Sequence, residues 1–179
     1  MAATSSEPPA LPVTIGELKA FLRIEGSGED AMLAGLLRGA VDLCEAFIGQ
    51  ALIARDVVET IAASYRWTCL RVVPVRAIDE VACIAPDGTA SLISSAAYSI
   101  DIDADGNGWL RVPPSGEASR VRVRYTAGMA EDWNGVPEPL RQGILRLAAH
   151  SYGTRGEGDA PPPASIAASW RPWRRLRAG

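Results

Sequence analysis

The spacing of apolar residues changes twice along this chain, and this change limits the folds that the chain can adopt. Between residues 14 and 49, apolar side chains recur at helical spacing in two runs. Between residues 55 and 126 they fall into short β-rich runs, some of which alternate with polar residues. Helical spacing returns between residues 137 and 153. This order predicts an α+β fold: a small helical bundle of two N-terminal helices plus one C-terminal helix, with a β-rich insertion between them.

Local signals mark the ends of the predicted helices. Thr14 and Glu17 have the spacing of a capping box, in which each side chain bonds to the backbone of the other residue. Gly49 follows the last apolar residue of the second helix, where a left-handed backbone is easiest for glycine. Pro137 and Pro139 open the third helix, because proline is favoured in the first turn.

Within the insertion, several runs are predicted to be strands, and turn residues such as Asp-Gly and Pro-Pro separate them. We expect these strands to form one β layer. The runs are Arg55–Ile61, Thr68–Val73, Ala77–Ala85, Ala90–Ile93, Ala97–Ile102, Trp109–Val112 and Arg120–Thr126.

The predicted domain plan has three parts. Residues 1–13 carry neither the positive charge nor the apolar run of a signal peptide, so we expect a disordered lead. Residues 14–153 are expected to form a single α+β domain. Residues 154–179 are expected to be a linker, rich in glycine and proline at its start, followed by a basic aromatic arm that contains a short helical turn. No run of 18 apolar residues is present, so no membrane span is expected.

The arm differs in charge from the rest of the chain. Its last ten residues contain two of the five tryptophans and four arginines but no acid, whereas the remaining 14 Lys and Arg residues stand against 21 Asp and Glu residues. Tryptophan and arginine dominate binding hot spots, so we expect this segment to dock on a partner protein. We expect Ser165–Gly179 to be poorly ordered or loosely held in the isolated subunit and to become ordered on that partner. The candidate partner-binding residues are Trp170, Arg171, Trp173, Arg174, Arg175 and Arg177.

The sequence offers little for catalysis or metal binding. The only histidine, His150, lies near the end of a predicted helix, where its partial positive charge suits the helix dipole. Asp101, Asp103 and Asp105 match the opening of a calcium loop, but Val112 replaces the bidentate glutamate that closes such a loop. A hairpin turn is the favoured interpretation. No catalytic residue, no metal and no cofactor are expected.

Short sequence runs occur in an ordered set along nearly the whole chain. Residues 18–53 read LKAFLRIEGSGEDAMLAGLLRGAVDLCEAFIGQALI. With the later runs, this opening resembles the head–tail connector (adaptor) family of tailed phages, prophages and gene transfer agents. The later runs are Trp67, Leu70–Val75, Tyr98 before Asp101, Val123–Gly128, Pro137, Leu140–Leu145, and His150 with Tyr152.

The resemblance implies a structural protein of the particle. Family members form a ring, commonly of twelve subunits, under the portal protein at the capsid vertex. The ring continues the DNA channel, touches passing DNA only weakly and presents a surface to a tail-side stopper or tail terminator protein. The C-terminal segment of similar adaptors reaches toward the portal. The implied location is the head–tail junction of the particle, with assembly in the bacterial cytoplasm.

One alternative function stays open from the residues themselves. Arg120, Arg122 and Arg124 alternate along one predicted strand, so all three fall on one face. Together with the basic tail, they could make the chain a nucleic-acid-binding module. Domains of that class are usually basic overall, whereas this chain has a net charge of −3.

Overall fold

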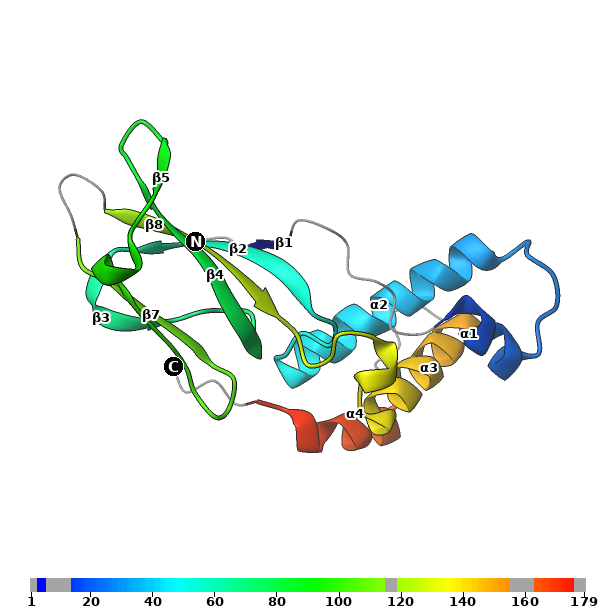
Figure 1. Ribbon diagram of the computed structural model, residues 1–179. Coiled ribbons are helices and arrows are strands. Elements are labelled where there is room, and N and C mark those ends of the chain that lie inside the picture. The colour runs from blue at the N-terminus through cyan, green and yellow to red at the C-terminus, as the bar shows by residue number, and fades with distance from the viewer. Residues whose placement is uncertain (1–2, 6–13, 115–118, 155–162, 176–179) are drawn as a thin grey trace. The chain divides into compact units, whose positions relative to one another are not determined.

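The computed structural model describes residues 3–5, 14–114, 119–154 and 163–175. The chain forms two compact units, each built from two separate stretches of sequence (Figure 1). A β unit comprises residues 1–9 and 54–129, and a helical unit comprises residues 10–53 and 130–179. The sequence predicts a single domain over residues 14–153, but the β-rich insertion has its own core and so makes a unit of its own.

The helical unit contains the two N-terminal helices and the C-terminal helix that the sequence predicts. A fourth helix, α4, follows them and packs beside α3 (Figure 1). The elements are α1 (Ile15–Leu22), α2 (Asp30–Ile48), the 3-10 turn η2 (Trp133–Gly135), α3 (Glu138–Gly153), α4 (Ala164–Trp170) and the 3-10 turn η3 (Arg171–Trp173).

The predicted helix ends are confirmed. The Thr14 backbone N–H donates to Glu17 Oε2 at 3.0 Å, and the Glu17 N–H donates to Thr14 Oγ1 at 3.2 Å, which completes the capping box. At the end of α2, Gly49 has φ of 70° and its N–H donates to the Glu45 carbonyl at 2.8 Å. Helix α3 begins directly after Pro137 and carries Pro139 in its first turn.

The β unit consists of two antiparallel sheets, not of the single layer that the sequence predicts. The larger has the strand order β1–β2–β8–β4–β5, and the smaller has the order β3–β7–β6. Buried residues of both sheets share one hydrophobic core, which explains why the strands divide into two layers. The strands are β1 (Ala3–Ser5), β2 (Arg55–Ala62), β3 (Ser64–Cys69), β4 (Val75–Ile84), β5 (Ala90–Leu92), β6 (Ser99–Ile102), β7 (Gly108–Val112) and β8 (Arg120–Ala127).

Two local predictions need correction. Residues 3–5 are not part of a disordered lead, because they form β1 and pair with Val57–Glu59 at the edge of β2; the rest of residues 1–13 lies outside the described residues. The strand predicted at Thr68–Val73 is β3, which begins at Ser64 and ends at Cys69. The backbone beyond Cys69 bonds instead to buried side chains of the larger sheet.

Those buried side chains are Glu59 on β2 and Tyr125 on β8. Glu59 is 1% exposed, and its Oε2 accepts hydrogen bonds from the Tyr125 hydroxyl and the Arg71 backbone N–H, both at 3.0 Å. Its Oε1 lies 3.4 Å from Arg71 Nε. The Tyr125 hydroxyl accepts a bond from the Val72 N–H at 3.1 Å, and burial raises the pKa of Tyr125. The network therefore ties the segment after β3 to the larger sheet.

The aspartate-rich segment that resembles a calcium loop is the turn between β6 and β7. Asp103 accepts hydrogen bonds from the Asp105 N–H, from the backbone and side chain of Asn107, and from Trp109 Nε1 at 3.0 Å. Gly106 has φ of 75°, the left-handed conformation that such a turn requires. The Trp109 bond, followed by the Asn107 bonds, lowers the pKa of Asp103 from 3.8 to about 2.

Replacing Asp103 with asparagine is expected to lower the thermal midpoint of the β unit at pH 7. Because the folded-state pKa is depressed, the carboxylate stabilises the fold above pH about 4, and this contribution disappears as the pH falls toward about 2. The difference in midpoint between the wild type and Asp103→Asn should therefore shrink over that range. A difference that stays constant from pH 7 to pH 2 would show that the charge of Asp103 has no part in the turn.

Candidate partner-binding segment

The side chain of Trp170, at the end of α4, lies inside the helical unit and is 2% exposed. It packs against α3 at Gly143, where an added Cβ would lie only 2.1 Å from Trp170 Nε1. Its ring also contacts Phe47 of α2, with centroids 5.9 Å apart and planes inclined by 56°. The indole therefore fills a space that exists because residue 143 has no side chain.

The expectation that residues 165–179 are loosely held in the isolated subunit is corrected for residues 165–175; residues 176–179 lie outside the described residues. Ile166 and Trp170 are both buried, and they fix α4 to the helices before it. The sequence did contain a signal for this packing. Gly143 is an isolated glycine within a helical pattern, which lowers helix stability unless another group packs closely against it.

The chain after Trp170 follows the C-terminal end of α2. The Arg175 N–H donates to the Ile48 carbonyl at 2.8 Å, and Gln50 Nε2 donates to the Trp173 carbonyl at 2.7 Å. The Arg174 guanidinium carbon lies 5.6 Å from the centroid of the Phe47 ring. These contacts satisfy a carbonyl that a helix end otherwise leaves without a partner, and they bring positive charge to the negative end of the helix dipole.

The surface that this segment offers to another molecule is smaller than the sequence suggests. Trp170 is part of the core. Arg171 and Arg174 are exposed, and Trp173 and Arg175 are half-buried. Arg177 lies outside the described residues. The arm therefore has an internal anchor, followed by a short basic stretch.

Replacing Gly143 with alanine is expected to destabilise the helical unit by about 1–3 kcal/mol, because the new methyl group would overlap the Trp170 ring. In a Trp170→Ala background the same replacement should be neutral or stabilising by up to about 1 kcal/mol, since alanine is the better helix former. Urea unfolding followed by far-UV circular dichroism would measure the free energy of unfolding of the wild type, the two single variants and the double variant, which together form a double-mutant cycle. Equal effects of Gly143→Ala in the two backgrounds would contradict the packing described.

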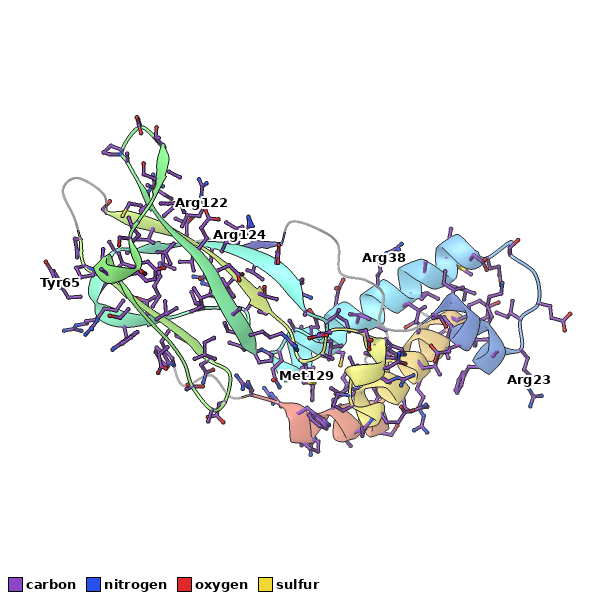
Figure 2. All side chains as sticks on the ribbon, viewed as in Figure 1. Arg23, Arg38, Tyr65, Arg122, Arg124 and Met129 are labelled. Carbon is purple, nitrogen blue, oxygen red and sulfur yellow. The ribbon has the colours of Figure 1, made fainter. Side chains whose placement is uncertain are left out.

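The basic strand of the alternative hypothesis is β8. Arg120, Arg122 and Arg124 are exposed and alternate with buried residues. Figure 2 shows Arg122 and Arg124 extending from the same side of β8. Only Arg124 among these three has an ion pair within the described residues, a long contact of 3.9 Å to Glu80.

The remaining candidates gain no chemical role from the structure. His150 is half-buried in the last turn of α3, as the dipole interpretation predicts. Within the described ranges, no three His, Cys, Asp or Glu side chains gather in a way that could hold a metal ion. The expectation that Asp101, Asp103 and Asp105 bind no calcium stays a prediction. In the same part of the chain, no helix combines the length and the apolar character that a membrane crossing requires.

Comparison by sequence gives no relative: no protein-family model and no curated protein matches the chain. Comparison by structure gives clear ones. A chain from the neck of an empty gene transfer agent (GTA) particle, computed with C6 symmetry, superposes with a TM-score of 0.81 at 24% identity. The match covers 100% of this chain and 99% of that chain. This chain has the fold of a GTA neck chain.

Two further structures agree with this result. A chain from the virion of a native GTA particle has a TM-score of 0.78 at 23% identity. A chain from the neck of a native GTA particle, computed with C12 symmetry, has a TM-score of 0.76 at 25% identity. Both matches cover 100% of this chain and 99% of the other chain. The likeness to the GTA neck chains therefore includes both units and the C-terminal segment.

Proposed function

We propose that this chain is a structural head–tail connector (adaptor) of a tailed phage, prophage or gene transfer agent. The observation that carries the proposal is the match over 100% of this chain and 99% of a GTA neck chain, with a TM-score of 0.81. A partial match could come from one shared domain in an unrelated protein. A match along both chains from end to end supports the same role in the particle, at the junction of head and tail.

In this role the chain forms a ring of twelve copies between portal and tail that continues the DNA channel. The C6 and C12 symmetries of the neck reconstructions support a ring with many copies. The net charge of −3 agrees with a passage that holds DNA only weakly, because a basic channel would retain phosphate. The role is mechanical and requires neither catalytic residues nor a cofactor.

The C-terminal segment is the proposed contact with the portal protein. Trp170 and Ile166 anchor it to the helical unit, so it leaves the subunit from a fixed point. Beyond that anchor, Arg171 and Arg174 are exposed and Trp173 is half-buried. The sequence has a further arginine at position 177. A portal surface with carboxylates around an apolar pocket would suit this composition. The opposite side of the ring would receive the tail-side stopper or tail terminator protein.

Reversing the charge of Arg171, Arg174 and Arg177 to glutamate tests this contact. The expected result is a folded protein that no longer enters particles, so that heads accumulate without tails. A matched control reverses Arg38, Arg66 and Arg146, three exposed arginines outside the segment, and should leave tailed particles at the wild-type level. If the segment variant assembles tailed particles as the wild type does, the portal contact lies elsewhere. If deletion of the whole chain leaves particle assembly unchanged, the proposed function is wrong.

The exposed arginines of β8 favour one second candidate, a nucleic-acid-binding module. This function requires that Arg120, Arg122 and Arg124 contact phosphates. Duplex binding by the isolated protein should then weaken steeply with salt and be lost in an Arg122→Glu variant. We expect no such binding at physiological salt, because the chain is acidic overall.

A further inference from the structure

One face of the larger sheet combines positive charge with one exposed large apolar side chain, Leu92. Residues directly opposite each other in antiparallel strands share a face, and Ala82 lies opposite both Arg122 and Leu92. Ile84 likewise lies opposite Arg120. We call this surface the Arg122 face; its members are Thr60, Ala82, Ile84, Leu92, Arg120 and Arg122.

The Arg122 face has the features of an unused contact surface. Leu92 is 69% exposed, although it is a large apolar side chain on a sheet. Arg120 and Arg122 are exposed as well, and within the described residues neither forms an ion pair or a hydrogen bond through its side chain. Two guanidinium groups without an ion pair lie on the same face as an exposed leucine side chain. A complementary partner would carry carboxylates next to apolar side chains.

Strand β6, at the edge of the smaller sheet, offers that combination. Ile100 and Ile102 are 45% and 39% exposed. Asp101 and Asp105 are exposed, and no side-chain hydrogen bond or ion pair reaches either carboxylate within the described part of the chain. The outer edge of β6 pairs with no other described strand. An exposed apolar edge strand is a liability that proteins normally cover. We call these four residues the β6 edge.

We infer that the β6 edge of one copy docks on the Arg122 face of the next copy. Ile100 and Ile102 lie on one face of β6, and Asp101 lies on the other. The strand therefore docks edge-on, with the isoleucines toward Leu92 and with Asp101, and Asp105 of the following turn, toward the guanidinium groups. They are different surfaces of the same unit, so the contact is heterologous, and repeating it produces a ring when the rotation closes. The inference rests on the proposed function, for which it supplies a subunit interface.

The exposed Leu92 side chain on the Arg122 face distinguishes a protein partner from DNA. A phosphate backbone would pair with the arginines but would leave Leu92 without a contact. The β6 edge uses both kinds of group. The composition of the chain agrees with a protein partner, because each copy carries 21 Asp and Glu residues against 18 Lys and Arg residues.

The lysine content of the chain allows a direct test. Lys19 is the only lysine, and its ammonium lies 2.9 Å from Asp30 Oδ1 of the same unit. In an Arg122→Lys variant, a zero-length carbodiimide reagent should couple the new amine to a carboxylate that touches it. We expect covalent dimers and higher oligomers, in the full-length protein concentrated alone and in assembled particles. Peptide mapping should place the link between position 122 and Asp101 or Asp105.

Two control variants show whether a link depends on this interface. An Arg38→Lys variant carries a new amine on the exposed side of α2 and should give no link to Asp101 or Asp105. Adding Asp101→Asn and Asp105→Asn to Arg122→Lys should abolish the link. Absence of a link in the particles, or a link to another acid, would overturn the inference. A pair of charge-reversal variants gives a further test. If Arg122→Glu abolishes binding to duplex DNA and Asp101→Arg leaves self-association unchanged, the Arg122 face binds DNA and the inference is overturned.

Failure of this inference can be told apart from failure of the proposed function. If the chain forms a ring in the particle but position 122 never couples to the β6 edge, only the interface is wrong. If the chain is absent from particles, the proposed function is wrong, and a link formed by the concentrated protein alone would then be unrelated to a neck.

Discussion

Replacing Trp170 with alanine is expected to lower the free energy of unfolding of the helical unit by about 3–5 kcal/mol. The indole is among the largest fully buried side chains of the chain, and it contacts α2 and α3 at once. Its loss would leave a cavity that Gly143 cannot fill. Urea unfolding followed by far-UV circular dichroism would measure the change.

A matched replacement controls for the general effect of removing a tryptophan. Trp67 on β3 is 43% exposed, so Trp67→Ala should cost less than about 1 kcal/mol. Truncation after Pro163 should destabilise the helical unit at least as much as Trp170→Ala, in contrast to what the sequence suggests. If truncation leaves the unfolding midpoint unchanged, α4 is not part of the core.

Replacing Glu59 with alanine is expected to lower the free energy of unfolding of the β unit by about 3 kcal/mol. The carboxylate is the acceptor for the Tyr125 hydroxyl and the Arg71 N–H, and its removal leaves these donors without their partner in a nearly water-free site. The segment after β3 should also loosen, because the Tyr125 hydroxyl that holds the Val72 N–H loses its own acceptor. Hydrogen exchange at Arg71 and Val72 would report that loosening separately from global stability.

A second glutamate provides the comparison. Glu80 on β4 is 44% exposed and lies 3.9 Å from Arg124, so Glu80→Ala should change stability by less than about 1 kcal/mol. If Glu59→Ala and Glu80→Ala lower the free energy of unfolding by similar amounts, the buried hydrogen bonds of Glu59 contribute no more to stability than an exposed ion pair.

The sequence predicted the helical elements well because their signals are local. The period of the apolar residues, the capping box at Thr14 and the glycine at position 49 all act within one or two turns. The strands β2 and β8 alternate between buried and less buried residues, and β4 was predicted from a short β-rich run. These features depend on neighbours in sequence, so a single chain is enough to find them.

Features that depend on distant residues were missed. The segment after Cys69 continues a β-rich pattern but bends, because Glu59 and Tyr125 capture its N–H groups. The sequence suggested that Trp170 was available to a partner. In the structure, Trp170 packs against α3 at Gly143, where the absence of a side chain leaves room for the indole. The first relation leaves no pattern in the residues nearby, and the second leaves only an isolated glycine within a helical pattern.

The candidate site was predicted only in part. Position and charge singled out the basic end of the chain, in which Arg171 and Arg174 are exposed and Trp170 is buried. That this end binds a partner stays a prediction. The Arg122 face could be read only as a row of arginines. The strand register was needed to place Leu92 beside them, and the sheet order was needed to identify β6 as an edge.

Electron cryomicroscopy of particles assembled with an epitope-tagged copy of this chain tests the central claim most directly. The account predicts a ring of density for this fold between the head and the tail, with the tag repeated around the channel. It also predicts that the segment around Trp170 faces the portal. Particles with complete necks that contain no copy of the chain, or a tag found only in another part of the particle, would contradict it.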